Sequence, residues 1–169
     1  MKTSIVYYSL TGNTAWAVRH IADRLDADLL ELRPCKAYPD RGVKKFLWGG
    51  KSAMMGEQPA LEPYAFDAGQ YDCVILATPL WAGRIAPPMR SFLHEQGSAL
   101  AGKQFGAVIC CSGGKDTKAF AQVREFLGCD DLVTLRLVDP KDRPDPGNED
   151  RINAFCRALT WANAEKEEP

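Results

Sequence analysis

Short apolar runs alternate with longer amphipathic stretches along most of the chain. Near-continuous apolar runs cover residues 3–8, 73–77 and 105–110. Runs of this length predict strands that are buried on both faces. Residues 28–33 and 132–138 instead alternate apolar and polar positions. Strands that alternate along the chain with helical stretches are typical of a parallel sheet covered by helices on both faces.

Two stretches have the periodicity of helices that bury one face. We expect the first over residues 12–25 and the last over residues 149–162, because apolar residues recur there at i, i+3, i+4 and i+7. Residues 164–169 are expected to form a frayed, charged tail. The apolar positions are Val18, Ile21, Ala22 and Leu25 in the first helix, and Ile152, Phe155, Cys156 and Leu159 in the last.

The composition of the five strands also predicts their order in the sheet. The three apolar strands suit positions with neighbours on both sides. The two alternating strands carry charges, such as Glu31 and Arg136, that suit sheet edges. Numbered along the chain, the strands are therefore expected in the order 2-1-3-4-5 rather than 3-2-1-4-5. In either order, a ligand would lie beyond the carboxyl ends of the strands.

Length, charge and cysteine content limit the class of protein. The 169 residues suit a single domain over residues 1–169, and 21 basic against 22 acidic residues give no sign of nucleic-acid or membrane binding. No stretch approaches the roughly 18 apolar residues of a membrane span, and the N-terminus does not resemble a signal peptide. The six cysteines lack CxxC spacing. We therefore expect reduced thiols, no metal and a cytoplasmic location.

The turn after the first strand carries the clearest candidate chemistry. Backbone N–H groups at the start of a helix attract an anion, and the positive end of the helix dipole adds to this. Ser9, Thr11 and Thr14 could donate hydroxyl hydrogen bonds, the Asn13 amide could donate as well, and Gly12 would let the backbone pass close. Without Lys or Arg in the turn, uncharged donors alone would bind a phosphate; the alternative is an ordinary capped turn. The turn consists of Ser9, Leu10, Thr11, Gly12, Asn13 and Thr14.

This turn resembles the phosphate loop of the flavodoxin family, whose pattern is Ser/Thr-x-Thr-Gly-x-Thr at the end of the first strand. The resemblance implies a flavodoxin-like three-layer α/β sandwich with a five-stranded parallel sheet in the order 2-1-3-4-5. It also implies an FMN whose phosphate sits on residues 9–14. The redox chemistry would belong to the cofactor, so no side chain need act as an acid or a base.

A second segment resembles the first of two further loops with which this family encloses FMN. Thr78 could hydrogen-bond the ligand, and Leu80 and Trp81 offer apolar surface for a ring system. Gly83 would permit the backbone change expected where a peptide carbonyl meets the flavin N5–H. The alternative is a Pro/Gly-rich loop with a buried tryptophan. The segment follows the third strand and comprises Thr78, Pro79, Leu80, Trp81, Ala82 and Gly83.

A third segment, after the fourth strand, would bring backbone N–H groups to the pyrimidine edge of the ring. It lacks the tyrosine that often stacks on the flavin in this family, so Trp81 is the predicted stacking partner. A reactive dithiol at Cys110 and Cys111 is an alternative to simple strand-end packing. The segment comprises Cys111, Ser112, Gly113 and Gly114.

Residues 34–71 form an unusually long connection, in which residues 42–55 have helical spacing with Trp48 outside the apolar stripe. This helix could be a surface crossover, or a lid or homodimer contact near the flavin. Residues 97–104 nearly match a nucleoside-triphosphate loop, but Gln104 replaces the magnesium-binding hydroxyl residue and a strand follows rather than precedes them.

Two redox functions and one non-redox function remain open. The chain could be an electron carrier or an NAD(P)H-dependent, FMN-containing quinone or flavin reductase, with a small-molecule or protein redox partner. Basic residues near the predicted loops favour the reductase weakly, because a nearby cation stabilises an anionic reduced flavin. The third possibility is an interaction module without flavin. The basic residues are Arg84, Arg90, Lys115 and Lys118, opposed mainly by Asp116.

Overall fold

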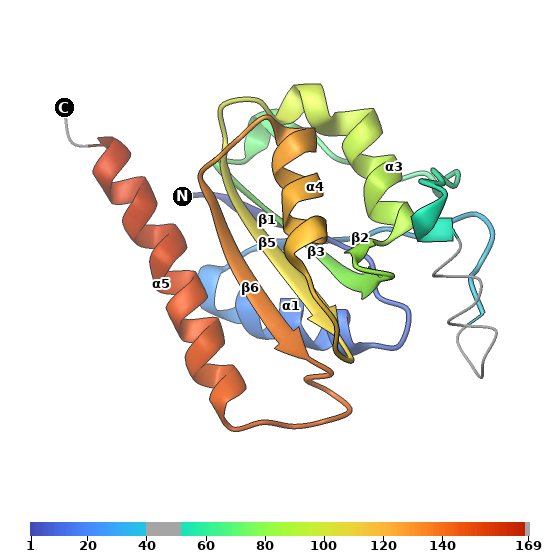
Figure 1. The fold of residues 1–169 in the computed structure, drawn as a ribbon. Coiled ribbons are helices and arrows are strands. Elements are labelled where there is room, and N and C mark those ends of the chain that lie inside the picture. Colours follow the sequence, from blue (N-terminus) through green and yellow to red (C-terminus); the bar gives the residue numbers. More distant parts are fainter. Residues whose placement is uncertain (40–51, 168–169) are drawn as a thin grey trace.

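A computed structural model describes residues 1–39 and 52–167 of the chain, which form a three-layer α/β sandwich (Figure 1). Its central sheet has five parallel strands in the order β2-β1-β3-β5-β6. This confirms the order predicted from the strand compositions. The strands are β1 (Thr3–Tyr7), β2 (Asp28–Glu31), β3 (Cys73–Trp81), β5 (Gln104–Cys111) and β6 (Leu132–Val138).

Two helices cover each face of the sheet. The apolar residues of α1 and α5 pack on one face, and those of α3 and α4 pack on the other. The predicted apolar faces of the first and last helices are both buried, except that Leu25 is partly buried. The last helix is longer than the expected residues 149–162. The helices are α1 (Asn13–Leu25), α3 (Pro87–Gln96), α4 (Thr117–Leu127) and α5 (Gly147–Glu167), with short 3-10 turns η1 (Ala68–Gln70) and η2 (Gly97–Leu100).

The burial of the strands explains their positions. Ile5 of β1 pairs with Leu29 of β2 and Ile75 of β3, and both isoleucines are fully buried. In β6, Leu135 is buried whereas the neighbouring Arg136 is exposed. The apolar strands therefore occupy the interior of the sheet, and the alternating strands form its edges, where charged side chains reach water.

The expectation that the third strand ends at Ala77, before a loop over residues 78–83, is wrong, because β3 continues to Trp81. It then turns back into β4 (Arg84–Ile85), which pairs antiparallel with the end of β3. The two turn residues, Ala82 and Gly83, have φ values of 50° and 76°. One of the two common two-residue hairpin turns, type I′, needs positive φ at both turn positions, a requirement that glycine meets without strain and alanine does not.

Pro79 can occupy this strand because of where it falls in the sheet. β3 pairs with β1 only as far as Ala77, opposite Tyr7, but pairs with β5 as far as Pro79, opposite Cys110. Proline has no N–H to donate and is tolerated where one side of a strand is unpaired. The end of β3 therefore projects beyond β1 and forms a wall above the carboxyl ends of the neighbouring strands.

The long connection between β2 and β3 runs beside α3. Its described part includes an isolated bridge between Pro34 and Leu61, and Phe66 packs edge-to-face on Phe92 of α3 with ring centres 5.2 Å apart. Trp48 and most of the helix predicted over residues 42–55 lie outside the described residues. None of the helices in the described part is long and apolar enough to cross a membrane.

We expect Gly106→Ala to destabilise the protein by about 1–3 kcal/mol, because overpacking a filled core forces its neighbours apart. A Cβ at Gly106 would lie 2.9 Å from Cζ of Phe155 in α5 and 3.2 Å from Cγ1 of Ile75. Urea denaturation measures the effect. Phe155→Leu removes the obstructing atom, so the double variant should be more stable than the sum of the single effects predicts. Additive effects would contradict this packing.

Candidate functional site

A cleft opens at the carboxyl ends of the strands. Its walls come from the β1–α1 turn, the end of β3, the end of β5 and the start of the β6–α5 connection. All three predicted loops therefore contribute to one cleft. Its lining residues are Ser9, Leu10, Thr11, Asn13, Thr14, Pro79, Leu80, Trp81, Ala82, Cys110, Cys111, Ser112 and Asp139.

Five predicted site residues do not line the cleft, namely Gly12, Thr78, Gly83, Gly113 and Gly114. The Thr78 side chain is buried, and its hydroxyl oxygen accepts a hydrogen bond from the backbone N–H of Ala86 at 3.1 Å. Thr78 thus ties β3 to the start of α3 rather than facing a ligand. Gly83 and Gly114 lie beside the cleft walls and shape the backbone there.

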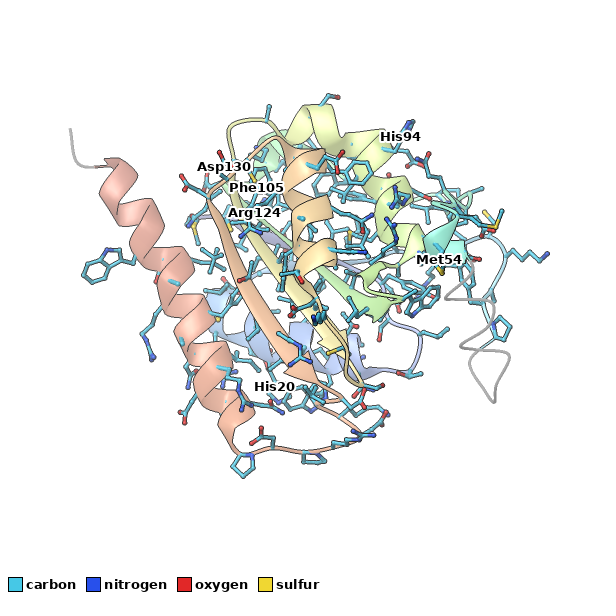
Figure 2. The ribbon with its side chains drawn as sticks, in the orientation of Figure 1. His20, Met54, His94, Phe105, Arg124 and Asp130 are labelled. Carbon is cyan, nitrogen blue, oxygen red and sulfur yellow. The ribbon has the colours of Figure 1, made fainter. Side chains whose placement is uncertain are left out.

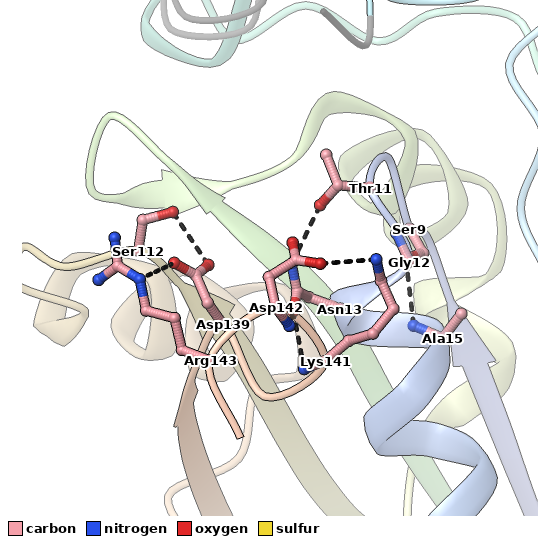
Figure 3. Close-up of polar contacts among 10 residues, drawn as sticks. All are labelled: Ser9, Thr11, Gly12, Asn13, Ala15, Ser112, Asp139, Lys141, Asp142 and Arg143. Atoms are coloured by element: carbon pink, nitrogen blue, oxygen red, sulfur yellow. Dashed lines mark hydrogen bonds and ion pairs between the residues drawn. The ribbon is translucent and has the colours of Figure 1, made fainter. Parts of the chain in front are cut away.

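The β1–α1 turn satisfies some of its own donors and leaves others free (Figure 3). The Ser9 hydroxyl oxygen accepts hydrogen bonds from the backbone N–H groups of Gly12 at 3.2 Å and Ala15 at 3.1 Å. Within the described part of the chain, no protein acceptor pairs with the backbone N–H groups of Asn13 and Thr14. These two groups begin α1 and can bind an anion together with the hydroxyl hydrogens of Ser9 and Thr11.

The Asn13 side chain is already fully hydrogen-bonded within the protein. Its Nδ2 donates to the Thr11 hydroxyl at 3.2 Å and to the Asp142 carboxylate at 2.7 Å. Its Oδ1 accepts from the backbone N–H groups of Lys141 at 2.9 Å and Asp142 at 3.2 Å. These four bonds use both donors and both lone pairs of the amide. Asn13 therefore keeps only its backbone N–H for a ligand, and its side chain joins the turn to the β6–α5 connection.

The β6–α5 connection brings a residue into the cleft that the sequence analysis missed. Asp139 has a φ of 38°, is 9% exposed, and accepts a hydrogen bond from the Ser112 hydroxyl at 3.0 Å. Its backbone N–H donates to the backbone carbonyl oxygen of Cys111 at 3.0 Å. The Nε of Arg143 lies 3.5 Å from its carboxylate. One signal in the sequence could have found it. Asp139 directly follows the last predicted strand, and the carboxyl end of that strand lies at the same edge of the sheet as the three predicted site segments.

Trp81 is packed between two tyrosines. It is 9% exposed, and its ring contacts Tyr8 and Tyr38 edge-to-face, with centroid distances of 5.8 and 5.1 Å. Burial raises the pKa of Tyr8, with a smaller contribution from Tyr38, so that phenol stays neutral. Trp81 lines the cleft, but its position fits a packed wall better than an open stacking platform.

The paired cysteines at the end of β5 fit strand packing rather than a reactive dithiol. Both are buried, and adjacent strand residues point to opposite faces of a sheet. Burial raises the pKa of Cys110 to about 12, only partly offset by a hydrogen bond with Thr14, so its thiol is protonated at neutral pH. All six cysteines of the chain are free.

Three aspartates in the described segments around the cleft each have a basic partner. Arg84 and Lys115 form no ion pair with any described residue. His20 on α1 and His94 on α3 lie on opposite sides of the sheet, and neither lines the cleft (Figure 2). The rim pairs are Asp116 with Arg136 at 3.4 Å, Asp139 with Arg143 at 3.5 Å and Asp142 with Lys141 at 2.6 Å.

A parallel sheet in this order, with a cleft where its central strands end, defines the flavodoxin-like class of α/β folds. No protein-family model and no curated protein sequence matches the chain. Solved structures do match it, and those described next are 19–20% identical to the chain, which establishes the fold alone.

Three of these structures cover nearly the whole fold. A protein from Bacteroides eggerthii assigned as a flavoprotein matches with a TM-score of 0.71 and 19% identity, over 94% of this chain and 98% of its own. A Lactobacillus acidophilus flavoprotein in complex with FMN matches with a TM-score of 0.66 and 20% identity, over 83% of this chain and 95% of its own. A Streptococcus pneumoniae flavodoxin matches with a TM-score of 0.62 and 20% identity, over 96% of this chain and 99% of its own.

We expect Asn13→Ala to destabilise the ligand-free protein by about 1–3 kcal/mol, because it leaves the partly buried backbone N–H groups of Lys141 and Asp142 without their acceptor. Urea denaturation without any flavin measures this effect. Thr11→Ala is the matched control, since it removes one of the four contacts and should cost much less. Equal stability of Asn13→Ala and the parent would show that the Asn13 side chain does not hold this connection.

Proposed function

We propose that this protein binds FMN and transfers electrons through it. The observation that carries the proposal is at one end of the cleft, where the backbone N–H groups of Asn13 and Thr14 have no acceptor among the described residues. The flavodoxin-like neighbours support it, because one of them is a complex with FMN. Flavin chemistry needs no acidic or basic side chain of the protein, and the cleft contains no such reactive set beyond Asp139 among its described lining residues.

The residues present fit the two ends of FMN. Thr11 and the N–H groups of Asn13 and Thr14 would hold the phosphate, and uncharged donors at a helix start suit an anion. The hairpin wall around Leu80 and the β5 wall around Ser112 would enclose the ring. Beside the cleft the two segments are in contact, because a Cβ at Gly114, which does not line the cleft, would lie 4.0 Å from Leu80. They would orient the ring and exclude water from one side of it.

An electron carrier and a reductase differ in what must approach the ring. The rim pairs neutralise the three nearby aspartates and leave Arg84 and Lys115 without ion-pair partners in the described chain. A cation beside the cleft stabilises negative charge on a bound ring and attracts anionic substrates. This observation favours, as a second candidate function, an NAD(P)H-dependent reductase of quinones or flavins. In either function, the partner would be a small molecule or a protein that exchanges electrons at the rim.

The binding proposal is tested by titrating the ligand-free protein with FMN and following quenching of flavin fluorescence. We expect saturable binding, and Thr11→Ala should weaken it by about 1–3 kcal/mol because a phosphate oxygen loses its donor. Thr134→Ala, at an exposed position on β6, is the matched control and should leave the affinity unchanged. A parent protein that does not bind FMN would refute the proposal, and equal affinity of both variants would remove Thr11 from the site.

The two redox functions separate in an assay of the FMN-loaded protein with NADPH and a quinone. Catalytic NADPH oxidation that depends on the quinone identifies a reductase. A carrier would not be reduced by NADPH alone but would accept electrons from an added reductase and pass them on. The same assay with Lys115→Met shows whether this rim cation contributes to donor binding.

A further inference from the structure

Lys141, in the connection between β6 and α5, covers the β1–α1 turn. A Cβ placed on Gly12 would lie 3.0 Å from Cε, 3.4 Å from Cδ and 3.8 Å from Nζ of Lys141. The lysine side chain thus fills the space that glycine leaves open at this turn. In Figure 3 its amine lies beside the same turn, close to Gly12. A turn without any basic residue in its own sequence therefore has a cation directly above it.

The position of Lys141 is built into the fold rather than set by a flexible side chain alone. The side-chain oxygen Oδ1 of Asn13 accepts hydrogen bonds from the backbone N–H groups of both Lys141 and Asp142. Asn13 itself is buried at the start of α1. The backbone from which the lysine extends is consequently fixed to the first turn of the helix whose N–H groups are free.

The present partner of the Lys141 amine holds it only weakly. The amine lies 2.6 Å from the Asp142 carboxylate, and both side chains are about half exposed, at 45% and 49%. Exposed ion pairs between neighbouring residues contribute little to stability, because water and salt screen them. A phosphate monoester carries more negative charge than one carboxylate and accepts stronger charge-assisted hydrogen bonds.

We propose that Lys141 is the counter-ion of the flavin phosphate. Its side-chain ammonium group would leave the Asp142 carboxylate and pair with a phosphate bound at the start of α1. This inference rests on the proposed FMN function and gives the site its selectivity for phosphorylated flavin over riboflavin. Asn13, whose side chain has no donor left for the phosphate, acts as a positioning residue for the lysine. The phosphate is then held by uncharged donors and one cation that comes from a distant part of the chain.

The test compares the affinities of the parent and Lys141→Met for FMN and for riboflavin. Loss of a charge-assisted contact should weaken FMN binding roughly tenfold to a hundredfold. Riboflavin has no phosphate, so its affinity should stay within about twofold of the parent value, since the lost contact is to the phosphate. Lys141→Arg should restore most of the FMN affinity. Inorganic phosphate should raise the melting temperature of the ligand-free parent but not that of Lys141→Met.

Arg157→Met is the matched control, because it removes an exposed cation of α5 that does not line the cleft. It should leave the preference for FMN over riboflavin unchanged. The inference is overturned if Lys141→Met keeps the FMN affinity of the parent, if it weakens FMN and riboflavin equally, or if Arg157→Met has the same selective effect. Failure of the parent to bind either flavin would instead refute the proposed function, so the two failures can be told apart.

Discussion

Four hydrogen bonds from one buried amide hold the candidate site together. Through Asn13, the first turn of α1 is joined to the connection between β6 and α5, two segments that lie more than a hundred residues apart. The sheet order makes this contact reachable, because β1, β3, β5 and β6 all end at the same edge. The amide fixes the helix start that presents its free N–H groups, and it fixes the backbone that places Lys141 above them.

Patterns that depend on burial along one element could be predicted from the sequence. Continuous apolar runs placed β1, β3 and β5 inside the sheet, and alternation placed β2 and β6 at its edges. The β1–α1 turn was also recognisable, since a cluster of hydroxyl residues and a glycine between a strand and a helix is a local feature. The strand order and the gathering of three loops into one cleft followed from these local signals.

Features that depend on partners distant in sequence could not be predicted in the same way. The hairpin at Ala82 and Gly83 was missed because Pro79 looks like the end of a strand unless the lengths of its neighbours are known. The hydrogen bonds of Asn13 were missed because an amide donor suits a phosphate and a protein carboxylate equally well. Asp139 and Lys141 were missed because a Pro/Asp-rich connection gives no sign of where its side chains lie.

The central claim is that an anion binds at the opening turn of α1. Backbone amide NMR of the 15N-labelled, ligand-free protein during an FMN titration tests it most directly, because it reports on each N–H group separately. The account predicts that the largest shifts occur at Asn13 and Thr14, with further shifts in the hairpin and at the end of β5. Shifts concentrated elsewhere, with these two amides unchanged at saturation, would contradict it.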